Sequence, residues 1–238
     1  MRQKVSIIAL LLGSALWLPP AFAQERIIGL LALPEVFGGG ACDHFIPRPV
    51  QLREAPQGPV VGTVFVVKPW THHDVGGCEG LEVGVRRAGA PAGIQALPTM
   101  EYGYEEPGAI VLERRGQWFR VRLATGSAWL EASAQNEFHE FEQLLGRGQD
   151  YLTEAWNGHV AASPGSVGRP AKSPRGAVFQ PVHVRRTSRQ NGDLWFLVDV
   201  MSHSECEGGG EPTVTDSGWV PAYGRDNEAV IWFSPRGC

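Results

Sequence analysis

One short stretch of the chain gathers side chains that could bind a metal ion. His72, His73 and Asp74 are consecutive, and Cys78 follows four residues later. Imidazole and carboxylate groups are common zinc ligands. Consecutive side chains of an extended segment point in opposite directions, however, so at most one of the two histidines can readily face a given ion. The pattern therefore favours a solvated polar loop, and it leaves His72, His73 and Asp74 only as candidate ligands.

The chain contains no recognisable catalytic motif. Gly-x-Ser-x-Gly is absent, and the neighbouring acids Glu105 and Glu106 show no sign of a pocket that would separate their pKa values. The acidic stretch 205–216 lacks the regularly spaced Asp and Asn ligands of a calcium loop. These observations predict a protein that is not an enzyme and that needs no cofactor.

Aromatic residues offer a different chemistry, the recognition of a ligand by flat side chains. Tyr102 and Tyr104 lie in the acidic run 101–106, where rings and carboxylates together would suit a ligand with basic or amine-bearing groups. Trp129 and Trp219 are assigned mainly to packing, because small β folds need large side chains in their cores. The candidate ligand-binding residues are Tyr102, Tyr104, Glu105, Trp118, Trp195 and Tyr223.

The N-terminus has the pattern of a secretory signal peptide. A basic start is followed by an apolar run from Val5 to Leu18 and by Ala21-Phe22-Ala23, which predicts residues 1–23 as the signal peptide and Gln24 as the mature N-terminus. No later segment is long and apolar enough to span a bilayer. We therefore expect a periplasmic or secreted protein. The formal net charge of −4, with scattered Arg pairs, disfavours nucleic acid as a partner.

Four cysteines follow the signal peptide. An even number in an exported chain indicates disulfides, and four cysteines allow three pairings. Their order along the chain favours Cys42–Cys78 and Cys206–Cys238.

An internal repeat organises the rest of the sequence. Residues 116–123 form a glycine-led strand, closed by Trp129, and residues 192–200 repeat this pattern, closed by Trp219. Side chains of a strand point alternately to its two faces. Trp118 and every second residue after it should therefore lie on one face, and the apolar residues that begin with Phe119 should lie on the other. Each copy is therefore predicted to be part of a small antiparallel sheet with one buried face.

Other segments are assigned from local signals. Strands are expected at 27–33, 50–53, 60–67 and 109–114, and hairpin turns at Asn157-Gly158 and Asn191-Gly192. A short helix is expected between the copies, with Ser133 as its N-cap, Gly146 as its stop, and an apolar face made by Phe138, Phe141, Leu144 and Leu145. Residues from about 68 to 107 are interpreted as a long insertion between two strands.

Four short motifs of the first half resemble the bacterial SH3-like family. They are Val50-x-Leu52-Arg53-x-x-Pro56, Val61-Gly62-Thr63-Val64, Gly116-x-Trp118-x-x-Val121 and Ala128-Trp129-Leu130. The second half is similar at Trp195 and at Gly218-Trp219-Val220, and 160–165 corresponds to the first strand. The resemblance implies a mainly β protein with two small SH3-like antiparallel barrels in tandem, joined by a short helix. The first domain would span 24–140, and the second 141–238.

The same resemblance implies a role in binding, because relatives with this fold are commonly targeting or binding modules on exported proteins. We therefore expect an exported, non-catalytic protein that recognises a peptide, a peptidoglycan (cell-wall) fragment or an envelope protein. The alternative is an envelope enzyme or a metal-dependent factor that uses the loop from His72 to Cys78.

Overall fold

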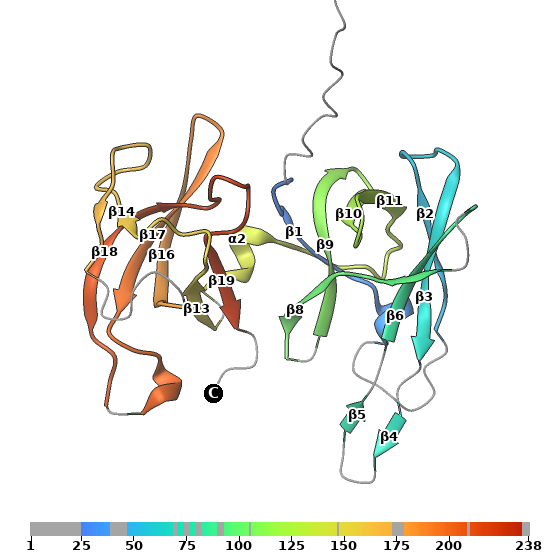
Figure 1. The fold of residues 1–238 in the computed structure, drawn as a ribbon, viewed down its shortest axis with the longest axis horizontal. Helices are drawn as coiled ribbons and strands as arrows, with labels where there is room; N and C mark the ends of the chain where they lie inside the picture. Colours follow the sequence, from blue (N-terminus) through green and yellow to red (C-terminus); the bar gives the residue numbers. More distant parts are fainter. Residues whose placement is uncertain are drawn as a thin grey trace, which may run out of the picture.

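The computed structural model describes residues 25–38, 47–68, 71–73, 77–79, 82–89, 93–104, 106–146, 148–172, 179–208 and 210–234. Of these residues, 54% lie in strands and 6% in helices, which confirms the predicted mainly β class. The strands pair in antiparallel sheets, which form two lobes with α2 (Phe141–Leu144) between them (Figure 1). Within the described residues neither lobe closes into a barrel, because the two large sheets remain open paths of strands.

The first lobe, residues 25–140, contains a ten-stranded sheet in the order β12–β1–β9–β10–β11–β2–β3–β6–β7, with β8 paired to β9. It also contains the short helix α1 (Pro34–Phe37) and the separate hairpin of β4 (Thr71–His73) and β5 (Gly77–Glu79). The strands of the large sheet are β1 (Gly29–Ala32), β2 (Val50–Arg53), β3 (Val60–Lys68), β6 (Glu82–Arg87), β7 (Ile94–Ala96), β8 (Thr99–Gly103), β9 (Glu106–Arg115), β10 (Trp118–Arg122), β11 (Ser127–Glu131) and β12 (Phe138–Glu140).

The second lobe, residues 148–234, contains a five-stranded sheet in the order β18–β17–β16–β13–β19. A two-stranded hairpin of β14 (His159–Val160) and β15 (Arg169–Pro170) accompanies it, together with the short 3-10 helix η1 (Glu205–Glu207). The strands of the sheet are β13 (Gln149–Leu152), β16 (Pro181–Gln190), β17 (Asp193–Met201), β18 (Val214–Pro221) and β19 (Ile231–Ser234).

Two strands of the first lobe contribute to two hydrophobic cores at once. Leu31 of β1 and Val111 of β9 belong to the core of the first lobe, whereas Leu30 and Ile110 belong to a cluster that contains Phe196 and other residues of the second lobe. β1 and residues 108–112 of β9 are buried on both faces, which explains why these two stretches are continuously apolar instead of alternating. The lobes therefore share a wall, made by β1 and β9.

The predicted repeat is present as two three-stranded meanders, β9–β10–β11 and β16–β17–β18, with matching register. In the first, Trp118 is opposite Glu131 and Arg120 is opposite Trp129. In the second, Trp195 is opposite Pro221 and Leu197 is opposite Trp219. The Asn-Gly turn between β16 and β17 has positive φ at both central residues, 53° and 85°, as a type I′ turn requires.

The predicted helix between the copies is mostly wrong. Phe138 lies in β12, and only residues 141–144 are helical. Strand pairing prevails here because β1 needs a neighbour on its second edge, and Leu31 pairs with Phe138. Ser133 stabilises a turn instead of capping a helix, since its Oγ accepts a hydrogen bond of 3.2 Å from the Gln135 amide.

One predicted hairpin is wrong, and the predicted insertion contains strands. The strands that flank Asn157-Gly158 do not pair with each other, because Val160 of β14 pairs with Arg169 and Ala161 pairs with Trp219. The predicted insertion, 68–107, contains strands of the large sheet: β6 pairs with β3, and β8 pairs with β9.

Candidate ligand-binding site

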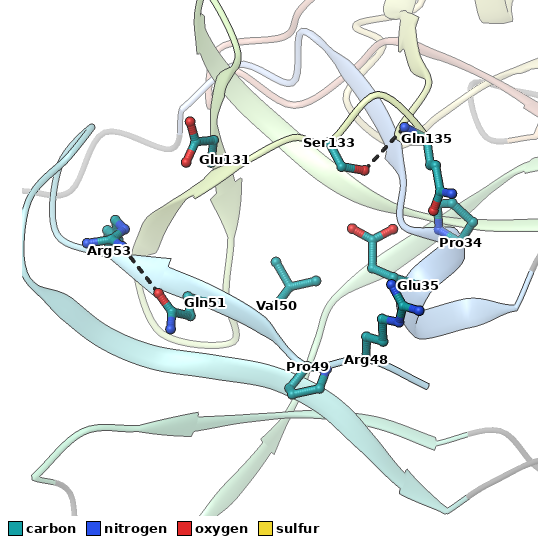
Figure 2. Close-up of a pocket in the computed structure, with 10 residues that line it drawn as sticks. All are labelled: Pro34, Glu35, Arg48, Pro49, Val50, Gln51, Arg53, Glu131, Ser133 and Gln135. Carbon is teal, nitrogen blue, oxygen red and sulfur yellow. Dashed lines mark hydrogen bonds between the residues drawn. The ribbon is translucent and has the colours of Figure 1, made fainter. Parts of the chain in front are cut away.

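A cavity of about 550 Å³ opens in the first lobe where β2 and β11 separate. These strands share a single register pair, Arg53 opposite Trp129, whereas β2 and β3 share four. Beyond that pair the two strands diverge, and residues from both sides line the gap between them (Figure 2). The lining residues are Pro34, Glu35, Arg48, Pro49, Val50, Gln51, Arg53, Glu131, Ser133 and Gln135.

The wall that follows β11 is a hydrogen-bonded turn. The Ser133 amide donates to Oδ1 of Asn136 over 2.6 Å, and the Asn136 amide donates to the Ser133 carbonyl over 3.2 Å. The Asn136 side chain also reaches across the cavity rim, donating from Nδ2 to both carboxylate oxygens of Glu35 over 2.9 and 2.8 Å. This bond ties the turn to α1, so two sides of the cavity hold each other.

The wall that precedes β2 is fixed through the backbone. The Arg48 amide donates to the Glu35 carbonyl over 2.7 Å, which anchors the start of this segment on α1. At the other end, Nη1 of Arg53 donates to the Gly58 carbonyl over 2.7 Å and Nη2 donates to Oε1 of Gln51 over 3.2 Å. Arg53 is therefore committed to the β2–β3 turn.

The four charged side chains of the cavity differ in whether they have hydrogen-bonding partners. Glu35 and Arg53 have the hydrogen-bonding partners described above. The guanidinium of Arg48 and the carboxylate of Glu131 form no hydrogen bond or ion pair with any other described residue. Both are exposed, so they are available to a ligand.

Among the predicted ligand-binding residues, Trp118 lies nearest to this cavity. It is half-buried, and it is not part of either hydrophobic core. Its ring centre lies 6.0 Å from the guanidinium carbon of Arg53, and it stands opposite Glu131 in the sheet. Both of these neighbours line the cavity.

The two predicted groove tyrosines lie in different surroundings. Tyr102 is in strand β8 and not on a loop; its ring stacks on His139, with centroids 4.3 Å apart. Burial, followed by the nearby Glu106 and Glu137, raises the pKa of its phenol. Tyr104 is 66% exposed at the turn after β8. Glu105, which completes the predicted trio, lies outside the described residues.

The remaining aromatic candidates are in the second lobe. Tyr223 donates a hydrogen bond of 2.6 Å to the Ile27 carbonyl, and the guanidinium carbon of Arg26 lies 5.2 Å from the centre of its ring, so Tyr223 joins the segment before β1 to the second lobe. Burial raises the pKa of Tyr223 to about 12. Trp195 is half-buried in β17, opposite Pro221. Neither residue lines the cavity of Figure 2.

The metal and disulfide predictions fall largely outside the described part of the chain. His72 and His73 lie in β4 and Cys78 lies in β5, but their side chains are not described, and Asp74, Cys42 and Cys238 are outside the described residues. Within the described residues no group of three potential metal ligands is present. The sulfur of Cys206, in η1, lies 3.3 Å from Oε1 of Gln149. Both disulfide pairings stay predictions.

Sequence reasoning did not find Glu35, Arg48 or Glu131. A usable signal was present, because Arg48 precedes the Val-x-Leu-Arg motif and Glu131 follows the closing Trp129-Leu130. Residues at or just beyond the ends of the strands that carry the motifs are held in position by the sheet, but they do not have to fill its hydrophobic core, so they are available for binding.

Comparison with known proteins gives no relative for this chain: no family model, no curated protein and no solved structure matches it. Among the described residues, no helix is long and apolar enough to cross a membrane.

Proposed function

We propose that this protein is an exported, non-catalytic binding protein with two SH3-like units, and that it recognises a peptide segment in the cavity between β2 and β11. The observation that carries the proposal is the cavity itself. Its volume of about 550 Å³ is within the usual range of ligand sites, and its walls are fixed by hydrogen bonds before any ligand arrives. The peptide would belong to a peptidoglycan fragment or to an envelope protein.

The tandem SH3-like interpretation is supported by more than the repeated sequence motif. The closing tryptophan of each meander also pairs with the segment assigned as the first strand of its unit. Trp129 pairs with Arg53, and Trp219 pairs with Ala161. Counting onward three residues from each partner reaches Pro56 and Pro164. The same order of strand, proline turn, meander and tryptophan contact therefore occurs twice.

The composition of the cavity supports binding without catalysis. Its ten lining residues include one hydroxyl, that of Ser133, and neither a histidine nor a cysteine. The Ser133 Oγ accepts a hydrogen bond from the Gln135 amide. Activation of such a hydroxyl needs a base within hydrogen-bond reach. The lining residues supply charge and shape, which suit recognition. Export is supported by the N-terminal sequence pattern.

A blocked-cavity variant tests this function. Ser133→Trp places an indole in the cavity and should abolish capture of peptides from a mixed-sequence library and from soluble peptidoglycan fragments, measured by affinity capture with mass spectrometry. Ser166→Trp is the matched control, because Ser166 is an exposed turn serine in the second lobe and also bonds locally, to the Ser163 carbonyl. Equal capture by both variants would show that the cavity is not the binding site.

A further inference from the structure

The two charged groups of the cavity that have no partner among the described residues carry opposite signs. Arg48 precedes β2, whereas Glu131 ends β11, and Figure 2 shows them at opposite ends of the cavity. Both side chains are exposed, and neither is held by another described residue. The cavity therefore presents a free positive charge at one end and a free negative charge at the other.

The charged side chains nearest to them, Glu35 and Arg53, are hydrogen-bonded to neutral groups and form no ion pair with Arg48 or Glu131 within the described residues. Near Arg48, both carboxylate oxygens of Glu35 accept hydrogen bonds from Asn136. Near Glu131, the guanidinium of Arg53 is bound to the Gly58 carbonyl and to Gln51. These bonds involve Nη1 and Nη2 of Arg53, and within the described residues Arg53 forms no ion pair with Glu131. The hydrogen bonding of the site therefore leaves Arg48 and Glu131 as the two charged groups of the cavity without a partner among the described residues.

The shape between the two ends suits an extended chain. β2 and β11 diverge from one register pair, so the gap between them is a wedge bounded by β2 on one side and by the end of β11 and the turn after it on the other. Val50, half-buried, and Pro49 provide apolar contact between the charged ends. A peptide in extended conformation can lie along such strands and direct alternate side chains to its surroundings.

We propose that the cavity selects an extended zwitterionic peptide, which places an acidic side chain on Arg48 and a basic side chain on Glu131. This inference rests on the proposed function and specifies its ligand class. Opposite charges at the two ends favour one arrangement of the ligand and penalise peptides that carry two charges of the same sign, because one end then meets a like charge.

Four synthetic peptides measure the charge requirement. All are N-acetylated and C-amidated: Glu-Ala-Thr-Ala-Lys, the two singly neutral forms Gln-Ala-Thr-Ala-Lys and Glu-Ala-Thr-Ala-Gln, and Gln-Ala-Thr-Ala-Gln. Isothermal titration calorimetry on the full mature chain at low salt should show that each neutral replacement weakens binding by up to about fivefold, the upper end of what one exposed ion pair contributes. The difference should shrink at high ionic strength, because exposed charges are screened.

Charge reversal in the protein makes the test specific to the two ends. Arg48→Glu should now prefer Lys-Ala-Thr-Ala-Lys, and Glu131→Lys should prefer Glu-Ala-Thr-Ala-Glu, each by about fivefold over the zwitterionic peptide. Arg225→Glu is the matched control, because Arg225 lines a cavity of the second lobe, and it should keep the wild-type preference.

Two results would overturn the inference. Wild-type protein that binds the Gln/Gln peptide as tightly as the Glu/Lys peptide, or binds none of them, does not select a zwitterion. If the charge-reversal variants keep the wild-type peptide preference, the ligand's charges are recognised by residues other than Arg48 and Glu131. Failure of the proposed function is a separate result, since Ser133→Trp would then leave library capture unchanged.

Discussion

The two meanders of this protein each border a cavity at the same place in their register, yet the cavities are lined differently. Glu131 and Pro221 occupy equivalent positions, each opposite the first tryptophan of its meander. Pro221 lines a cavity of about 690 Å³ in the second lobe, as Glu131 lines that of the first. Counting back five residues from the partners of Trp129 and Trp219 reaches Arg48 and Trp156, which also line their respective cavities.

In the second lobe the equivalent side chains are engaged in structure. Trp156 is 4% exposed, and its indole N–H donates to the His159 carbonyl over 2.9 Å. Tyr223, which corresponds to Ser133, holds the Ile27 carbonyl and contacts Phe141, with ring centroids 5.7 Å apart. In the first lobe, Arg48 and Ser133 are exposed at these positions. The second-lobe side chains are thus engaged in packing and in the junction between the lobes, whereas Arg48 and Ser133 stay exposed, which supports the proposal that the first-lobe cavity binds a ligand.

The largest expected effect tests whether the two meanders are structurally equivalent. Trp129 is 5% and Trp219 is 7% exposed, and each ring lies under an arginine, Arg115 at 4.9 Å and Arg186 at 5.4 Å from the ring centre. Trp129→Ala and Trp219→Ala should each lower the free energy of unfolding by about 3–5 kcal/mol. Urea denaturation followed by circular dichroism measures this.

Trp118→Ala is the matched control for these two variants. Trp118 lies on the same face of β10 as Arg120, and Arg120 stands opposite Trp129. Because Trp118 is only half-buried, its loss should lower the free energy of unfolding clearly less than the loss of Trp129. A Trp219→Ala variant as stable as the wild type would mean that the two copies share register without sharing their packing.

A second prediction concerns the dependence of stability on pH, which a buried acid in β13 of the second lobe should influence. Asp150 is 1% exposed, one of its oxygens accepts the Gly146 amide over 3.0 Å, and the other has no partner among the described residues. Burial raises the pKa of this carboxyl to about 7 from 3.8. Between about pH 4 and 7 the folded chain therefore keeps a proton on Asp150 that the unfolded chain has already lost.

The sign of the effect follows from this difference in bound protons. The stabilising contribution of protonated Asp150 is complete below about pH 4 and is lost as the pH rises to about 7, which costs up to about 4 kcal/mol. Asp150→Asn keeps an oxygen for the Gly146 amide and should remove this part of the pH dependence. Equal slopes for the variant and the wild type in denaturation at pH 5, 6, 7 and 8 would show that Asp150 does not carry the effect.

Local signals in the sequence were sufficient for the meanders. The alternation of Trp118, Phe119 and Arg120 and the Asn191-Gly192 turn depend on neighbours within a few residues, and the structure confirms both. Such features are set by the pleat of a strand and by positive φ, which short sequences encode directly.

The shared wall and the first-lobe cavity could not be predicted from such local signals. The continuous burial of β1 and β9 results from contact with both lobes, and Phe138 is in a strand because β1 recruits it. The cavity depends on the pairing of Arg53 with Trp129, which are far apart in the sequence. Long-range pairing of this kind overrides local propensity.

The last and smallest expected effect separates two residues that the sequence predicts to act together. Tyr104→Ala should change the free energy of unfolding by less than about 0.5 kcal/mol, because the side chain is 66% exposed. Tyr102→Ala should be more costly, since its ring stacks on His139 and packs against the cluster shared by the lobes. Neither tyrosine lines the cavity, so both variants should retain peptide capture. Weaker capture by Tyr104→Ala at unchanged stability would instead locate the contact surface at the turn between β8 and β9, and the first-lobe cavity would then lose its assigned role.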